Sequence, residues 1–331
     1  MKIFINKHGE FRSGWTLAFA LLAWLFVQMI TVVIITIVAG VQAGMAMARE
    51  PAADPAAVTE AVIATAAAMS EAPPTYILMN AVMSGVMFLL FYVVYKRPVE
   101  QIGFYKEGWL KHLLLGGLFG IALIVLAAVI LYVSGTATIS AVQIGHLGRL
   151  AWWAGLLMMV AVGFTEELLS RGIMMTALKT TRNKWAIVLI PAVIFGIMHM
   201  GNSNVTVFSV INIVLVGVLF AYLFVKTGRL WAPIGFHITW NFVQGYVLGV
   251  PVSGLGSIVE NSVMATVFTG PDWLTGGAFG IEGGAACTLV NIAGLVFIHF
   301  CLKQSEGLWG FDSDMPLTRE VPAQEGQAAH E

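Results

Sequence analysis

The chain of 331 residues is strongly apolar, with 58% hydrophobic residues, 11% charged residues and a mean hydropathy of +0.85. An ordinary soluble domain carries about 25% charged residues, so this composition predicts an integral membrane protein without a large soluble domain. The formal net charge of -1 and the lack of a basic cluster argue against nucleic acid as a partner. The only two cysteines, Cys287 and Cys301, are interpreted as small apolar side chains.

Hydropathy predicts an all-α, polytopic fold with about eight transmembrane helices, because each span needs about 20 apolar residues. We expect a basic cytoplasmic tail at 1–14, a helical membrane domain at 15–303 and a polar, disordered cytoplasmic tail at 304–331. The apolar runs lie near 15–40, 76–95, 112–133, 151–176, 185–200, 205–225, 233–250 and 284–302.

The lysines and arginines set the expected orientation, because these residues accumulate in cytoplasmic loops. With eight spans and the N-terminus inside, 15 of the 17 fall in inner segments. Only Arg49 and Arg149 fall in outer segments. This asymmetry predicts a multi-pass membrane protein with both termini in the cytoplasm.

Two early segments favour structural roles. The outer stretch at 48–75 is rich in alanine and proline and mildly acidic, and we expect a short amphipathic surface helix in it. "GGLFG" (116–120) has the small-residue spacing that lets helices pack closely.

The fourth apolar run contains "GFTEELLSRG" (163–172), which carries three charged residues. Inserting one charged side chain near the bilayer centre costs a free energy of about 2.5–3.5 kcal/mol. Glu167 and Arg171 are four residues apart with the acid first, the favourable order for a helical ion pair. Glu166 points about 100° away around the helix and has no such partner. The pairing leaves Glu166 unexplained.

Two later runs add polar groups. "FGIMH" places Phe195 and His199 one turn apart, and "HITWN" does the same for His237 and Asn241. An imidazole and an amide on one face can hold water, an oxyanion or a metal-bound ligand. Taken singly, each group also fits helix pairing, headgroup contact or interhelical hydrogen bonding. Together with Glu166, they indicate one convergent polar pocket on three apolar helices.

The last segments have simpler interpretations. "GGAFGIEGG" (276–284) predicts a tight loop or one that dips toward the membrane. It lacks the Lys and Ser/Thr of a phosphate loop, so no nucleotide is expected. Its Glu282 is noted without a role, and His299, near the end of the last helix, is predicted to be interfacial.

The pocket residues suit hydrolysis by two routes. In one, Glu166 acts as general base toward water while histidine and asparagine side chains stabilise the oxyanion. In the other, Glu166, His199 and His237 ligate zinc and leave one position open for water. No GxSxG or HExxH motif is present to support a serine or zincin-type mechanism.

With "EELLSR" (166–171), "FGIMH" (195–199) and "HITWN" (237–241) in this order, the chain resembles the CPBP family of intramembrane proteases. That family includes the prenyl-protein endopeptidase that processes CAAX termini, and many bacterial relatives. Its pattern is EExxxR, FxxxH and HxxxN on three membrane helices, and the resemblance covers about 150–250. It implies a location in a bacterial cell membrane.

The resemblance also implies roles for the motif residues. Glu166 would activate water, His199 would position it, and His237 with Asn241 would stabilise the oxyanion. The supporting residues would be Glu167, Arg171 and Phe195. Both a metalloprotease mechanism and a metal-free glutamate mechanism have been proposed for the family. The resemblance therefore does not determine whether zinc is a cofactor.

The leading hypothesis is an intramembrane endopeptidase that hydrolyses a peptide bond of a membrane-associated or prenylated-like protein or peptide. We expect its site to open toward the cytoplasm or laterally to lipid. The alternatives are a transporter or ion or proton relay that uses the same groups, and a noncatalytic immunity or scaffold protein.

The expected depths of the two histidines in the membrane differ. At 1.5 Å per residue, His237 would lie about 8 Å and His199 about 20 Å from the inner side. The helices must therefore be tilted, broken or displaced for the two side chains to meet.

Overall fold

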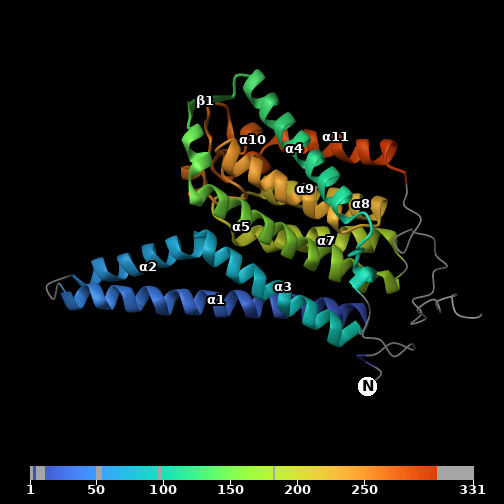
Figure 1. Cartoon of the computed structure of the whole chain (residues 1–331), viewed down its shortest axis with the longest axis horizontal. Helices are drawn as coiled ribbons and strands as arrows, with labels where there is room; N and C mark the ends of the chain where they lie inside the picture. Colours follow the sequence, from blue (N-terminus) through green and yellow to red (C-terminus); the bar gives the residue numbers. More distant parts are fainter. Residues whose placement is uncertain (1–2, 5–11, 50–53, 96–98, 182, 304–331) are drawn as a thin grey trace, which may run out of the picture.

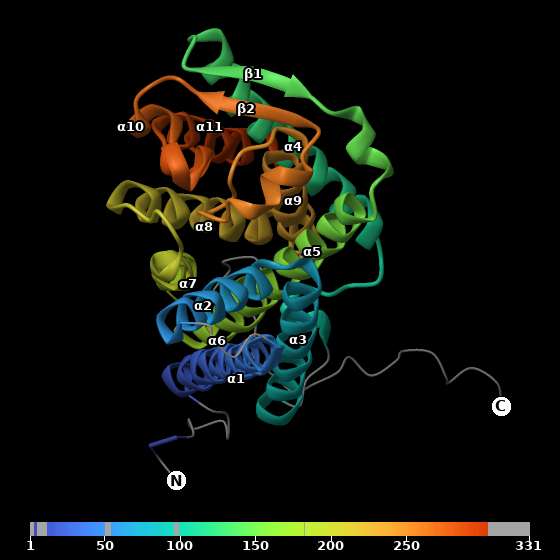
Figure 2. The ribbon, with the colours of Figure 1, turned by 90° about the vertical axis from the view of Figure 1, so that its left-hand side faces the viewer.

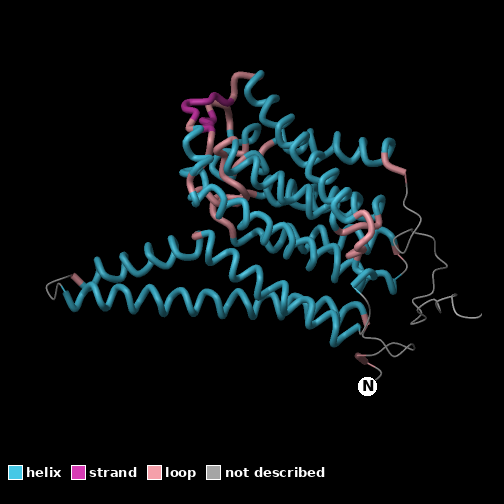
Figure 3. Tube along the Cα trace, viewed as in Figure 1, coloured by secondary structure: helices cyan, strands magenta, loops and turns pink. Residues whose placement is uncertain are grey.

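The computed structural model describes residues 3–4, 12–49, 54–95, 99–181 and 183–303. Helices account for most of these residues, with two short strands at one end (Figure 3). The tail predicted at 304–331 and most of that predicted at 1–14 lie outside the described residues. An all-α, multi-pass architecture is therefore confirmed for the part of the chain that is described.

Three helices at the N-terminal end form one layer of the molecule (Figure 1): α1 (Ser13–Arg49), α2 (Pro55–Glu71) and α3 (Pro73–Tyr95). Helix α2 begins where Asp54 accepts a hydrogen bond from the backbone N–H of Ala56, with proline as the first helical residue. Both features favour a helix start. A helix therefore forms within 48–75, where one was expected.

The other layers hold the remaining helices (Figures 1 and 2). These are α4 (Trp109–Val133), α5 (Leu150–Glu167), α6 (Met175–Leu178), α7 (Lys184–Met198), α8 (Val207–Thr227), α9 (Trp231–Phe242), α10 (Asp272–Thr275) and α11 (Ala285–Cys301). A π-helical segment, Leu168–Met174, joins α5 to α6, and a second one, Val243–Val247, extends α9.

A small antiparallel sheet, absent from the sequence prediction, lies beyond the end of α4 (Figure 2). Strand β1 (Ala137–Val142) pairs with β2 (Met264–Phe268), and the register slips between Ile139 and Ala141. The sheet ties the segment after α4 to the segment before α10.

The prediction of eight spans is not supported. Six helical segments in the described part of the chain are long and apolar enough to cross a membrane: Ser13–Ala46, Pro73–Val93, Trp109–Val133, Leu150–Leu178, Lys184–Gly201 and Val207–Thr227. Helix α9 has 12 residues and α11 has 17. Their lengths are about 18 and 26 Å, against about 30 Å for the hydrocarbon core. The hydropathy pattern shows an apolar run in each of these two segments, but it does not show where the α-helices end.

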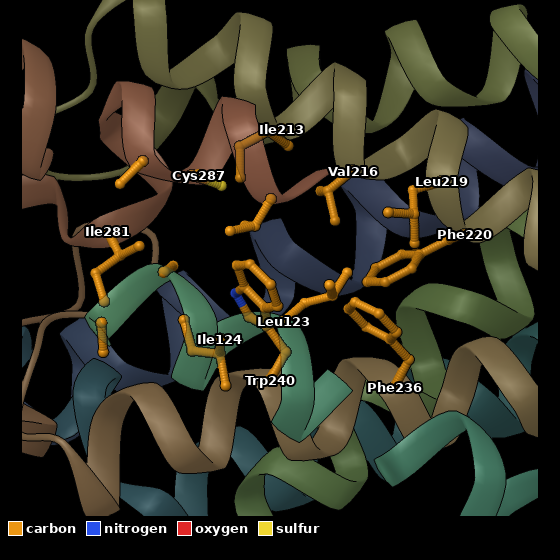
Figure 4. Packing of buried hydrophobic residues seen from close by; sticks show 14 of the residues in the cluster. Leu123, Ile124, Ile213, Val216, Leu219, Phe220, Phe236, Trp240, Ile281 and Cys287 are labelled. Atoms are coloured by element: carbon orange, nitrogen blue, oxygen red, sulfur yellow. The ribbon is translucent and has the colours of Figure 1, made fainter. Parts of the chain in front are cut away.

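Helices α4 and α9 approach closely through glycine. A Cβ on Gly116 would overlap the carbonyl oxygen of Ala232, and one on Gly235 would overlap that of Leu113. The packing role predicted for "GGLFG" is thus confirmed. Beside this contact, residues of α4, α8, α9 and α11 form an apolar core that includes Trp240 and the buried Cys287 (Figure 4).

The glycine-rich loop at 276–284 folds as tightly as predicted. Gly276 and Gly280 have φ angles of 90° and 99°, a region that favours glycine. A Cβ on Gly280 would also overlap the carbonyl oxygen of Pro251. This close approach carries Glu282 into the interior, where it is buried.

Candidate active site

Glu166 and Glu167 occupy the last turn of α5, immediately before the chain widens into the π-helix. π-Helical turns are rare and frequently occur at functional sites. The predicted pair is present: Nη1 of Arg171 lies 2.8 Å from Oε1 of Glu167, and both side chains are fully buried. Glu167 and Arg171 therefore offset each other's charge inside the protein.

Arg171 also ties the π-helical segment to its neighbours. Its Nη2 donates to the carbonyl oxygen of Gly217 in α8 at 2.9 Å. Its guanidinium lies 4.6 Å from the ring centroid of Phe195 and 5.0 Å from that of Phe220. Cation–π contacts of this kind gain strength when they are removed from water. Arg171 thus connects α5, α7 and α8.

The carboxylate of Glu167 has a second partner that the sequence analysis missed. Nδ1 of His237 donates to its Oε1 at 3.0 Å, across 70 positions of the chain. The hydrogen bond from a protonated Nδ1 to Glu167 fixes the orientation of the imidazole ring. It directs Nε2 of His237 away from Glu167. The i, i+4 spacing predicted only Arg171 as a partner of Glu167. No local sequence pattern indicated His237.

His199 is oriented in the same way by a backbone group. It follows the end of α7, and its Nδ1 donates to the carbonyl oxygen of Phe195 at 2.8 Å. The Phe195 ring lies against the imidazole, with centroids 4.7 Å apart. One turn of helix therefore supplies both a ring contact and a hydrogen bond to His199.

Both imidazoles face Glu166. Oε2 of Glu166 lies 3.9 Å from Nε2 of His199 and 3.8 Å from Nε2 of His237. This oxygen is buried and has no hydrogen-bond partner within the described residues. Polar atoms at such separations are commonly bridged by water. Three of the four groups predicted to converge therefore do so, at distances that suit a small molecule held between them.

Asn241 lies one turn beyond His237 in α9 and lines the same cavity. The cavity holds about 410 Å³ and is lined by residues of α1, α2, α3, α5, α7, α8, α9 and α11 and of the loops at 201–203 and 252–255. Ligand sites are typically concavities of about 300–1,000 Å³. The volume of this cavity falls within that range.

The zinc alternative fits these residues only in part. Carboxylate and imidazole are suitable zinc ligands, and hydrogen bonds at Nδ1 commonly orient ligating histidines. Among the described residues, however, no group of three or more His, Cys, Asp or Glu side chains is arranged to hold a metal ion. In this arrangement, Oε2 of Glu166 lies 3.9 and 3.8 Å from the Nε2 atoms of His199 and His237, the two nitrogens that would ligate zinc with it.

Two other residues noted in the sequence have different positions. His299 lies outside the cavity lining, and its Nδ1 makes a 2.8 Å hydrogen bond with the hydroxyl of Tyr222. Glu282 does line the cavity, together with the candidate residues. A carboxylate within an apolar, glycine-rich loop was the only sequence signal for it.

The fold is that of a multi-pass membrane protein. It holds a carboxylate and two histidines around one cavity between its helices. Residues 148–243 match the family model described as "Type II CAAX prenyl endopeptidase Rce1-like". The match covers less than a third of the chain but includes all three motifs, and it confirms the resemblance to the CPBP family. No curated protein and no solved structure matches the chain significantly. The family match supports a membrane protease.

Proposed function

We propose that the protein is an intramembrane endopeptidase in which Glu166 activates water. The observation that carries this proposal is the buried, unpartnered Oε2 of Glu166, which faces Nε2 of both His199 and His237. A carboxylate and two oriented imidazoles around one small space are the groups that a water-activating site requires. The family match provides independent support for peptide-bond hydrolysis.

In the proposed reaction, Glu166 accepts a proton from water as the water oxygen attacks the scissile carbonyl carbon. His199 orients the water. Asn241 and doubly protonated His237 donate to the oxyanion. The carboxylate of Glu167, which accepts from Nδ1 of His237, stabilises that imidazolium while Glu166 holds the proton taken from water. When the intermediate collapses, the C–N bond breaks and Glu166 returns its proton to the leaving amine.

The supporting residues act through the histidines. Glu167 sets the orientation of His237, and Phe195 that of His199. Arg171 compensates the buried charge of Glu167 and lies over the Phe195 ring. Groups held in productive geometry before the substrate binds save the cost of arranging them during the reaction.

The cavity lining and the family match support the proposed substrate class. The lining combines apolar residues of α1 and α3, such as Trp24 and Met83, with polar groups around Glu166. Such a lining favours the peptide bond of a membrane-associated or prenylated-like protein. CAAX prenyl endopeptidases give the matching family its description.

The side of the membrane on which the cavity opens limits the choice of substrate. The cavity lining includes the exposed Ser203 and the partly exposed Glu71, near the ends of helices opposite to the basic stretches at 106–111, 179–181 and 226–229. If those basic stretches face the cytoplasm, the cavity opens on the opposite side of the membrane. The expected cytoplasmic termini are then incompatible with the expected cytoplasmic opening of the site. We favour a substrate that reaches the site from the outer side or laterally from lipid.

The test compares the purified wild type with Glu166→Gln, which keeps the size of the side chain but cannot accept the proton. Cleavage of a peptide library, thermal melting and bound metal are measured for both. We expect cleavage to fall at least about 100-fold with unchanged melting. Equal cleavage rates would refute the role of Glu166. Full wild-type activity in chelator would oppose the zinc route, and liposome flux without cleavage would favour a transporter.

A further inference from the structure

Glu282 is a buried carboxylate to which the proposed reaction assigns no step. Its backbone is anchored to α8, because Nδ2 of Asn212 donates to the carbonyl oxygens of Glu282 and Gly284, each at 2.9 Å. The hydroxyl of Thr288 donates to Oδ1 of the same asparagine at 2.7 Å. The carboxylate therefore extends into the cavity from a fixed point.

One oxygen of Glu282 binds α9. Nε1 of Trp240 donates to Oε1 at 3.3 Å. Trp240 lies three residues after His237 and directly before Asn241, and its ring stacks on Phe236 with an interplanar angle of 15°. A hydrogen bond at this indole holds the part of α9 that carries both candidate residues.

The other oxygen binds the segment beside His199. Oε2 accepts hydrogen bonds from the backbone N–H of Ser253 and from its hydroxyl, the latter at 2.8 Å. The carbonyl oxygen of Ser253 in turn accepts from Nδ2 of Asn202 at 2.8 Å. The backbone N–H of Asn202 donates to the carbonyl oxygen of His199 at 3.1 Å.

Ser253 has a conformation that requires such support. Its φ angle of 49° is unusual for a residue with a side chain. Burial raises the pKa of Glu282, and the two hydrogen bonds from Ser253 oppose that rise. The carboxylate and the strained loop thus stabilise each other at the cavity wall.

We infer that Glu282 is a positioning residue, which sets the separation of His199 and His237. It does so by binding α9 directly and the His199 segment through Ser253 and Asn202. The inference rests on the proposed function for its effect on catalysis, but the positioning itself is independent of it. Glu282 lies outside the matched stretch at 148–243. The three motifs alone are therefore insufficient to build the site.

The experiment uses Glu282→Gln, because an amide of similar size cannot accept hydrogen bonds at both ends. Ser253→Ala is a milder variant that removes only the hydroxyl donor. Glu260→Gln is the matched control, since Glu260 is exposed and lies away from the cavity lining. Each full-length protein in detergent is assayed for thermal melting, for kcat and KM, and for its ¹⁵N-histidine spectrum. His199 and His237 signals are assigned from His199→Gln and His237→Gln.

We expect kcat of Glu282→Gln to fall by about 10- to 100-fold, the scale of a roughly 1 Å misplacement, with KM nearly unchanged. Both histidine signals should shift, and Ser253→Ala should give a smaller effect in the same direction. The control should match the wild type. A lower melting temperature with unchanged kcat and unshifted signals would overturn the inference, since a merely structural role predicts that result.

The outcomes separate this inference from the proposed function. If the wild type cleaves no peptide but the histidine signals of Glu282→Gln shift, the proposed function fails and the positioning role stands. If Glu166→Gln abolishes cleavage while Glu282→Gln keeps wild-type kcat and unshifted signals, the positioning role fails alone. If Glu282→Gln does not fold, wild-type kcat and signals for Ser253→Ala overturn the inference.

Discussion

Nδ1 of His237 and Nη1 of Arg171 meet at the same carboxylate oxygen of Glu167, at 3.0 and 2.8 Å. The contact between His237 and Glu167 fixes α9 against α5 in the buried interior. It also turns Nε2 of His237 toward Glu166, the neighbour of Glu167 in sequence. Two adjacent glutamates therefore have separate roles: one faces the cavity and the other holds the imidazole.

This division predicts opposite phenotypes for the two glutamates. Glu167→Gln leaves the Arg171 charge uncompensated, and removing one partner of a buried ion pair typically costs about 3–5 kcal/mol. We expect a clearly lower melting temperature for this variant. Glu166→Gln should melt like the wild type, because Glu166 has 27% of its side chain exposed and no direct hydrogen bond at Oε2. Thermal melts that fail to distinguish the two would contradict the assignment.

Arg171→Lys is expected to destabilise the protein although it keeps the charge. A lysine cannot bind Glu167 and the Gly217 carbonyl in the fork geometry of a guanidinium while stacking on aromatic rings. The expected loss is about 1–3 kcal/mol, the scale of a lost buried hydrogen bond to a charged group. Arg149→Lys is the control, because Arg149 is exposed. Equal melting of both variants would show that the guanidinium geometry is unimportant.

Glycine substitutions test the packing of α4 on α9. Gly116→Ala places a methyl group against the carbonyl oxygen of Ala232 and should cost about 1–3 kcal/mol, as overpacking does. Gly85→Ala in α3 meets no atom within 4 Å and should be neutral or stabilising by about 0.4–1 kcal/mol. Thermal melting of the two proteins measures the difference. A tolerated Gly116→Ala would mean that the helices can separate without loss.

Cysteine labelling can establish which side the cavity faces. Ser203 is exposed and lines the cavity, whereas Lys106 is exposed in a basic connection. In a Cys301→Ser background, we expect an impermeant maleimide added to intact cells to label Ser203→Cys but not Lys106→Cys. Permeabilised cells should label both, which controls for reactivity. The reverse pattern in intact cells would place the opening on the cytoplasmic side and favour a cytoplasmic substrate.

Local regularities made much of the candidate site predictable. The 3.6-residue period places residues four apart on one face, so the Glu167–Arg171 pair and the His199–Phe195 contact followed from spacing. The cost of a charge in lipid singled out Glu166. The span count was less predictable, because an apolar run does not show that α9 becomes a π-helix after Phe242.

The amino-acid sequence by itself determined a multi-pass helical membrane protein, its motif residues and its family resemblance, because composition and helical spacing are local properties. Only the tertiary structure decided that Glu167 holds His237, that Glu282 lies at the cavity wall, and that Glu166 meets two histidines despite the depths expected from straight helices. Those contacts join segments about 30 to 70 positions apart. Helix packing, glycine contacts and π-helical turns set them, and no local pattern records where distant segments meet.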